Sequence, residues 1–183
     1  MNAIQTKYRG TNFRSRLEAR WAAFFDALGW PYDYEPLDLN GYIPDFVLHF
    51  YEPLLVEVKP ALSFADLAQH EAKIEQSGWQ HNALIVGARI FFEEPYCVNH
   101  NDYHPRLGAL SQHYAAGWFW SEGRLINCTS CKKYGIFHDC GAWYCLRCGN
   151  GGKDVLGDVR DEIIKFMWNE AGSTVQWNPW DRR

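Results

Sequence analysis

The sequence predicts an α/β protein in which helices flank a mixed central sheet. Three observations lead to this fold class: an amphipathic stripe of helical period near the N-terminus, a series of short β-type segments after it, and a short apolar run that follows a second helical segment. The resulting order is helix, strand, strand, strand, helix, strand, over about residues 11–90. We therefore expect one compact core at residues 1–90, with smaller elements after it.

The first expected helix covers residues 13–29. Its large apolar residues are four, three and four positions apart and share one face: Leu17, Trp21, Phe24 and Leu28. Thr11 or Asn12 is a suitable N-cap, and Gly29 is a suitable end. The stripe predicts that this helix packs against the sheet.

Three strands are expected next, a short one within residues 30–36, where Tyr32 and Tyr34 alternate, and two more at residues 42–51 and 54–59. In the second of them, side chains alternate between two faces, with Phe46, Leu48 and Phe50 on one and Asp45, Val47 and His49 on the other. Glu52-Pro53 is a turn signal, so the second and third strands should form a hairpin.

A second helix is expected at about residues 64–76, because Ser63 and Asp66 have capping-box spacing. The run NALIVGA at 82–88 is short and apolar, as in a buried strand. Residues 91–126 are expected to form an irregular connecting segment, in which the aromatic run at 117–120 is compatible with one more strand. Residues 127–153 hold clustered cysteines, and residues 154–183 should form a C-terminal helix (154–170) and a tail. In that helix Val155, Val159, Ile163 and Phe166 share a face.

Composition and charge exclude several classes of protein. Apolar residues make up 47% of the chain and aromatic residues 16%, which is enough for a sizeable core. There is no apolar stretch of about 18 residues and no apolar segment at the N-terminus, so we expect no membrane span, no secretory signal and a cytoplasmic location. The net charge of −4 excludes a uniformly basic DNA-coating protein. Two segments, 1–25 and 124–153, are nevertheless basic, each with five Lys or Arg residues against one acid. These segments could contact phosphates or could be ordinary solvated surfaces.

Two short motifs carry the chemistry of the core. Pro44-Asp45 is followed, after eleven residues, by Glu57-Val58-Lys59. With the upstream helix that bears Glu18 and the order of the elements, these motifs resemble the PD-(D/E)XK nuclease superfamily over roughly residues 13–87. The resemblance implies a restriction-endonuclease-like core and a nuclease that hydrolyses phosphodiester bonds with Mg²⁺ or Mn²⁺.

The residue types suit that chemistry. Magnesium prefers oxygen ligands and retains several waters, so one or two carboxylates suffice to hold it. The turn of the hairpin brings Asp45 near Glu57, and Glu57 and Lys59 lie two residues apart on one face of a strand. The resemblance implies that Asp45, Glu57 and the Val58 carbonyl are metal ligands. Lys59 would then orient the attacking water or stabilise developing charge.

Further site residues are less specific. Glu18 would assist the metal through water, but Ser15 and Glu18 also have capping-box spacing. Gln69 and Gln76 on the second helix are further candidates, and solvated glutamines are the alternative for both.

The cysteines indicate a second metal. Cys128 and Cys131 form one Cys-x₂-Cys pair, and Cys145 and Cys148 form another after thirteen residues, which is the pattern of a four-thiolate zinc site of the zinc-ribbon kind. Cys140 and His138 could each replace a ligand, but the paired spacing favours the other four. Cys97 stands apart and is expected in the core.

The expected function is cleavage of DNA, with RNA as an open second substrate. Lys132, Lys133 and Arg147 stand among aromatic residues in the cysteine segment, and Arg14 and Arg16 precede Glu18, so these five are the candidate nucleic-acid contacts. The alternative role of zinc is to replace a core in a segment too short to have one. The alternative function is a non-catalytic protein that binds nucleic acid or protein on a nuclease scaffold. A homodimer is compatible with the sequence, and a phage origin is suggested by analogy alone.

Overall fold

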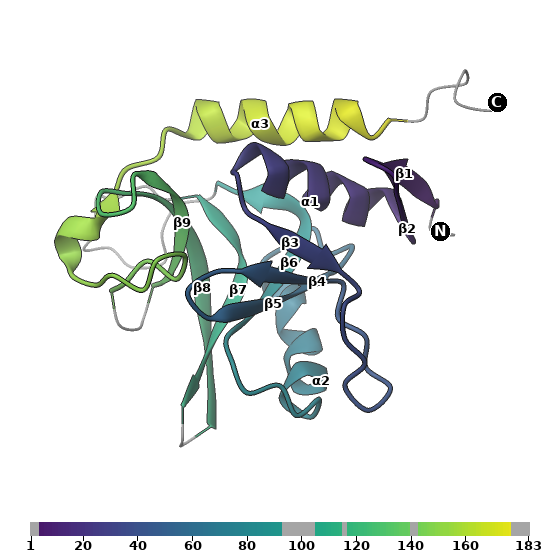
Figure 1. Cartoon of the computed structure of the whole chain (residues 1–183), viewed down its shortest axis with the longest axis horizontal. Helices are drawn as coiled ribbons and strands as arrows, with labels where there is room; N and C mark the ends of the chain where they lie inside the picture. The colour runs from purple at the N-terminus through teal and green to yellow at the C-terminus, as the bar shows by residue number, and fades with distance from the viewer. Residues whose placement is uncertain (1–3, 93–104, 115–116, 140–142, 177–183) are drawn as a thin grey trace.

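The fold was analysed in a computed structural model, which describes residues 4–92, 105–114, 117–139 and 143–176. Two helices and a 3₁₀/α segment surround a large mixed sheet (Figure 1). The helical elements are α1 (Arg16–Ala27), η1 (Ala65–His70), α2 (Glu71–Glu75), η2 (Lys153–Val155) and α3 (Asp161–Thr174). The α/β class and the mixed sheet predicted from the sequence are thereby confirmed.

The main sheet has the order β10-β8-β7-β6-β5-β4-β3, and β9 pairs with β8. Its strands are β3 (Tyr32–Tyr34), β4 (Phe46–His49), β5 (Pro53–Val58), β6 (Ala83–Phe91), β7 (Arg106–Tyr114), β8 (Gly117–Cys128), β9 (Lys133–His138) and β10 (Leu156–Gly157). A separate hairpin of β1 (Thr6–Tyr8) and β2 (Thr11–Phe13) precedes α1. Within the main sheet, the pair of β5 and β6 is parallel. The crossover that such a pair needs is formed by η1 and α2, which connect the two strands.

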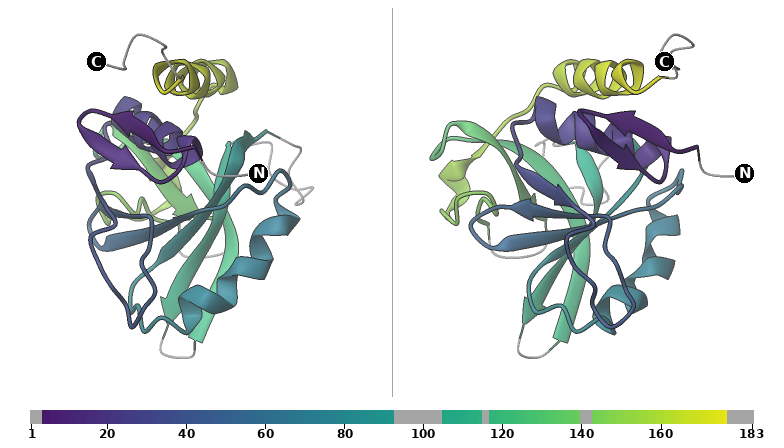
Figure 2. Two further views of the ribbon diagram at one scale, coloured as in Figure 1. Left: turned by 90° about the vertical axis from the view of Figure 1, so that its right-hand side faces the viewer. Right: turned by 45° about the vertical axis from the view of Figure 1, so that its right-hand side comes forward.

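The sheet is covered on both faces (Figure 2). Helix α1 lies on one face, and α3 packs on the outer side of α1 through contacts of Trp168 with Trp21 and Phe24. The other face is covered by η1 and α2 through Leu67 and Ile74. Consecutive residues of β5 divide between these two cores, as the two-residue period of a strand requires.

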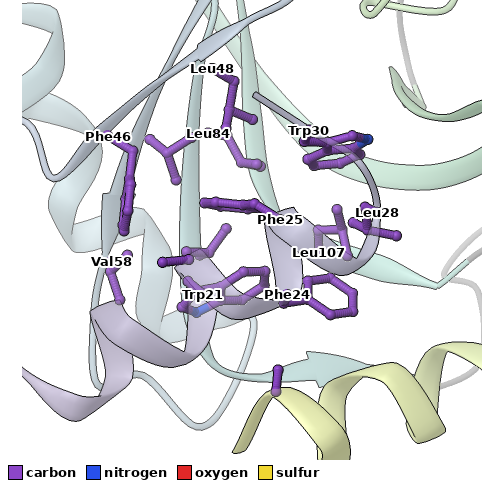
Figure 3. Close-up of a cluster of buried hydrophobic side chains, with 14 of the residues drawn as sticks. Trp21, Phe24, Phe25, Leu28, Trp30, Phe46, Leu48, Val58, Leu84 and Leu107 are labelled. Atoms are coloured by element: carbon purple, nitrogen blue, oxygen red, sulfur yellow. The ribbon is translucent and has the colours of Figure 1, made fainter. Parts of the chain in front are cut away.

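The core under α1 is rich in aromatic side chains. Trp21, Phe24 and Phe25 of the helix meet Phe46 and Leu84 of the strands (Figure 3). Phe25 contacts the edge or face of several rings, with a centroid distance of 5.4 Å to Phe46. This packing fixes α1 over the β4–β5 hairpin and so determines where the N-terminal end of α1 lies.

Three predicted boundaries are wrong. Helix α1 begins after Ser15, not at residue 13, because residues 11–13 pair with β1. Residues 106–114 and 117–126 are not an irregular connection, since they belong to β7 and β8 of the main sheet. Helix α3 begins at Asp161 rather than 154, and Phe166 on the expected apolar face is 65% exposed.

The strand β7 was missed because its residues do not alternate. Residues 105–112 are all buried, and they include Arg106, Ser111 and Gln112, whose polarity indicated a loop. Ser111 is satisfied by the backbone of Ala83, from which it accepts at 2.8 Å and to which it donates at 3.1 Å. A central strand that carries internally bonded polar residues cannot be distinguished from a loop by its pattern.

Candidate functional site

The β4–β5 hairpin brings together the acidic residues predicted from the two motifs. Asp45 directly precedes β4, and Glu57 and Val58 end β5. The backbone N–H of Val58 donates to Asp45 Oδ2 at 2.7 Å, which ties the start of one strand to the end of the next. Both carboxylates are buried, with 5% exposure for Asp45 and 4% for Glu57.

Asp45 also contacts Arg14. Nη2 of Arg14 donates to Asp45 Oδ1 at 2.7 Å, and Nε of Arg14 lies 2.6 Å from Glu35 Oε1. Burial, and next the negative charge of Glu57, raise the pKa of Asp45 to about 7. An acid in this state gives up its proton readily when a cation arrives beside it.

Glu57 has a partner on each oxygen. Nζ of Lys59 donates to Oε1 at 2.5 Å, and the hydroxyl of Tyr42 donates to Oε2 at 2.8 Å. Burial, followed by the charge of Glu57, raises the pKa of Tyr42, so the phenol stays protonated and remains a donor. Glu57 and Lys59 therefore lie on one face, as the strand period predicted, and Tyr42 is a site residue that the sequence did not indicate.

Glu18 is held by the start of its own helix. Ser15 is the N-cap of α1 and accepts from the Glu18 backbone N–H at 3.1 Å, and its hydroxyl donates to Glu18 Oε1 at 2.7 Å. Ser15 and Glu18 therefore form the N-cap half of the capping box weighed against a site role, with the Glu18 carboxylate bonded to the Ser15 hydroxyl. Tyr34 donates to the other oxygen, Oε2, at 2.6 Å. Glu18 is nonetheless buried and close enough to Asp45 that its charge raises the pKa of Asp45.

Gln69 and Gln76, the glutamines considered from the sequence, are exposed on the second helical segment. The amide of Gln69 donates to the backbone oxygen of Asp66 within its own segment. Burial, and next the positive charge of Lys59, lower the pKa of His70 on the same segment. No spacing rule in the sequence links residue 70 to residue 59.

The four paired cysteines form a second cluster. The sulfur atoms of Cys128, Cys131, Cys145 and Cys148 all lie within 4.8 Å of one another, and those of Cys128 and Cys148 are 3.8 Å apart. Four thiolates around a tetrahedral zinc ion, at about 2.3 Å from it, have sulfur–sulfur separations of about 3.8 Å. The cluster can therefore hold a metal ion such as zinc.

The electrostatics of the cysteines fit a cation. Burial raises the pKa of Cys145, and charge on Cys128 and Cys148 raises it further. At Cys128 burial also acts to raise the pKa, but hydrogen bonds from the backbone N–H groups of Cys131 and Ser130 outweigh it, so the pKa is lowered. Sulfur atoms that oppose each other's ionisation are relieved by a metal at their centre.

His138 and Cys140 were the two alternative ligands considered for the sulfur cluster. His138 is buried away from the sulfur cluster, with Nε2 3.3 Å from the carbonyl oxygen of Phe119. Cys140 and Cys97 lie outside the described residues. Among the residues that the structure describes, the four paired cysteines are the single group of three or more metal-ligating side chains that meets this distance criterion.

Two of the five basic residues proposed to contact nucleic acid are engaged within the chain. Arg14 pairs with Asp45 and Glu35. Arg147 donates to three backbone carbonyls, those of Leu28, Gly29 and Tyr134, at distances of 2.6–3.2 Å. The other three, Arg16, Lys132 and Lys133, are exposed and form no ion pair with another described residue.

Comparisons with known proteins give no relative. No family model matches the chain, and no curated protein or solved structure matches it significantly. None of the helices in the described part of the chain combines the length and the apolar composition needed to cross a membrane.

Proposed function

We propose that the protein is a Mg²⁺- or Mn²⁺-dependent nuclease of the PD-(D/E)XK type that cleaves DNA. The observation that carries the proposal is the hairpin of β4 and β5, which places Asp45 and Glu57 side by side with Lys59 on the Glu57 face. A restriction-endonuclease-like core is part of the proposal. It is supported by the order α1, β3, β4, β5, α2, β6 and by the parallel pairing of β5 with β6.

The donor set fits a hard divalent cation. Asp45, Glu57 and the Val58 carbonyl would hold the ion through oxygen atoms, as magnesium prefers. When bound there, the cation supplies positive charge to the scissile phosphate and acidifies a water. Arg14 donates to Asp45 Oδ1 and Lys59 donates to Glu57 Oε1. These two oxygen atoms therefore already bind positively charged groups.

The chain's own residues have distinct tasks in this proposal. Lys59 turns its ammonium group from Glu57 toward the attacking water or the phosphate, where it stabilises developing negative charge. Tyr42 keeps Glu57 Oε2 in place, and Tyr34 and Ser15 do the same for Glu18. Arg14, once displaced from Asp45, remains beside the site as a cation for the substrate phosphate.

A direct test is cleavage of plasmid, linear duplex and single-stranded DNA, and of RNA, with magnesium, manganese or chelator. We expect magnesium-dependent cleavage, and loss of at least about 100-fold in rate for Glu57→Ala and for Lys59→Ala. Asp33→Asn is the matched control, because Asp33 is an exposed carboxylate on β3 that pairs with His49 away from the site. Equal activity of all three variants would reject the site and indicate a contaminating nuclease.

A second candidate function is nucleic-acid or protein binding without cleavage. It is favoured by one observation: each carboxylate oxygen of Asp45 and Glu57 already has a hydrogen-bond partner in the chain. Calorimetric titration with magnesium distinguishes the two functions. Binding that Asp45→Asn abolishes supports the nuclease, while absence of binding together with retained DNA affinity supports the binding protein.

A further inference from the structure

An aromatic pocket lies where the cysteine module, defined here as residues 127–157, meets the β4–β5 turn. Its volume is about 500 Å³, in the range of small-ligand sites. The rings of Tyr51, Trp143 and Tyr144 line it, together with Leu146, Gly149 and the carboxylate-bearing Glu52. Neither the proposed cleavage site nor the sulfur cluster uses these side chains.

The pocket is built by two segments that hold each other in place. The backbone N–H of Tyr51 donates to the carbonyl oxygens of Leu146 and Arg147 at 3.3 and 3.1 Å. The ring of Tyr51 lies directly over Gly149, since a Cβ atom there would be 2.8 Å from ring carbons. Gly149 follows Cys148 with a φ of 75°, so the knuckle of the second cysteine pair forms one wall.

The exposure of Tyr51 makes the pocket accessible. Tyr51 is 72% exposed although its backbone is fixed, and Trp143 and Tyr144 are partly exposed. Large aromatic rings on a fixed backbone form stacking surfaces for flat ligands, and unpaired nucleobases are the flat ligands that a nucleic acid offers. Bases in a duplex already stack on both faces and cannot enter.

Glu52 is the charged residue among those that line the pocket, and its Oε2 lies 3.9 Å from His81 Nδ1. A carboxylate only accepts hydrogen bonds, so it favours a base edge with donors. Guanine presents two adjacent donors, N1–H and the N2 amino group, which match the two oxygens of a carboxylate. Adenine, cytosine and thymine each present a single donor group on that edge.

Charge favours a nucleic acid over an organic cation, which aromatic rings and a carboxylate could also hold. Among the basic residues of 124–153, Arg124 and Arg147 are held within the chain, whereas Lys132 and Lys133 are exposed. The phosphates of a strand bound in the pocket would be attracted to these two lysines, which an organic cation would not be.

We propose that this pocket binds one unpaired guanine of a nucleic-acid strand. This proposal rests on the proposed function and extends it, because it names a feature of the nucleic acid that the protein would bind. Tyr51 is six residues from Asp45 and two beyond the end of β4, and even a fully extended chain of that length spans at most about 20 Å. The β4–β5 turn and the N-terminal end of α1 are on opposite sides of the hairpin in Figure 1. A strand seated in the pocket could therefore extend along the hairpin to the carboxylates.

The test measures binding without cleavage. Fluorescence anisotropy with full-length, zinc-loaded protein and no added magnesium would compare labelled thymidine octamers that contain one central guanine, adenine, cytosine or thymine, and a duplex in which the guanine is paired. We expect the guanine octamer to bind at least about tenfold more tightly than the other three, and the paired guanine to have no advantage.

Variants assign the preference to the pocket. Tyr51→Ala and Trp143→Ala should each weaken the guanine octamer about tenfold, and Glu52→Gln should remove the guanine preference but keep the affinity for thymidine. Phe119→Ala, at an exposed aromatic residue of β8, is the control and should change nothing. Zinc content shows whether the module remains folded in Trp143→Ala and in Tyr51→Ala, and Tyr51→Ala tests the pocket from outside the module.

The outcomes separate this inference from the proposed function. Equal affinity for the four octamers, or a guanine preference that survives Tyr51→Ala and Glu52→Gln, overturns the pocket even if the protein cleaves DNA. Binding of a trimethylammonium compound in place of the octamers overturns it as well. A guanine preference in a protein that never cleaves would leave the pocket established and reject the nuclease.

Discussion

At the residue scale, Asp45 links the chemistry of the site to the stability of the chain. Its pKa is raised to about 7 by burial and by the charge of Glu57, so the folded protein favours the protonated acid. In the unfolded chain the pKa returns to about 4. Between these values the folded state binds more protons than the unfolded state, so stability must fall as the pH rises.

This gives a prediction for the metal-free protein. The stabilising contribution of Asp45 to the free energy of unfolding is fully present below about pH 4. It is lost as the pH rises through about 7, and the free energy of unfolding falls by up to about 4 kcal/mol. Asp45→Asn removes the ionisation, so the difference in unfolding free energy between wild type and variant should grow in favour of the variant from pH 5 to pH 8. Urea denaturation at several pH values measures it. A pH-independent difference would contradict the raised pKa.

Arg147 has a different set of contacts in the structure from the one that the sequence predicted. Its spacing within a basic, aromatic segment indicated a phosphate contact, yet its guanidinium joins the cysteine module to the end of α1 through the carbonyls of Leu28, Gly29 and Tyr134. The contacts with Leu28 and Gly29 join residues more than 100 positions apart, which local sequence does not reveal.

We accordingly expect Arg147→Ala to act on stability. Removing the donor takes this bond from the carbonyl of the buried Leu28, whereas the Tyr134 carbonyl keeps the bond from Trp30 Nε1. The loss of such a bond to a buried acceptor costs about 1–3 kcal/mol. Hydrogen exchange should show faster opening at residues 28–30 and 134–136, and Lys132→Ala should show no such change. If Arg147→Ala instead leaves exchange unaltered and only flattens the salt dependence of DNA binding, the phosphate role predicted from the sequence is right.

At the scale of elements, the cysteine module has a small apolar core around its sulfur cluster. The apolar residues packed within it are few: Ile126, Phe137, Val155 and Leu156 with the cysteines themselves. A segment with so small a core gains much of its folding energy from a bound metal.

The resulting prediction concerns zinc stoichiometry. Wild type should bind one zinc per chain, and serine at Cys128, Cys131, Cys145 or Cys148 should lose it and loosen residues 127–157. Cys140→Ser and Cys97→Ser should keep the metal. Elemental analysis and limited proteolysis decide the matter. Zinc lost from Cys140→Ser but kept in one of the other four variants would overturn the ligand set.

The elements that the sequence predicted well are those with a local signal. The stripe on α1, the capping pair Ser63 and Asp66, and the hairpin of β4 and β5 all depend on residues close in sequence. The elements and partners that it missed depend on distant residues. Tyr42 reaches Glu57 and Tyr34 reaches Glu18 only because the strands pair in one register. The polar residues of β7 are satisfied across the sheet, so their presence in a buried strand has no local signature.

At the scale of the whole molecule, α3 closes the aromatic core. Its Trp168 is 6% exposed and lies over Trp21 with a centroid distance of 4.7 Å. On its other side Arg20 stacks at 3.9 Å from the ring centroid and donates through Nε and Nη2 to the Trp168 carbonyl. A C-terminal helix thus stabilises α1, which carries Glu18 and the N-terminal edge of the candidate site.

Trp168→Ala should therefore destabilise the whole fold by about 3–5 kcal/mol, because a large buried ring is lost and a cavity remains. The midpoint of thermal unfolding should fall on the order of 10 °C. Phe166→Ala on the same helix is the control, since Phe166 is 65% exposed, and it should shift the midpoint little. Similar shifts for the two variants would mean that α3 does not pack as described.

The long strand β8 has a consequence for anyone who would engineer this chain. Its first half pairs with β7 in the main sheet, and its second half pairs with β9 and ends at the metal-ligating Cys128. Residues 127–153 could not be moved to another protein as an independent cassette, because the donor chain would lose the edge of its sheet and the recipient would gain half of a strand pair. A transplant of the metal-binding unit would have to begin before β7. It would then include strands from the centre of the sheet.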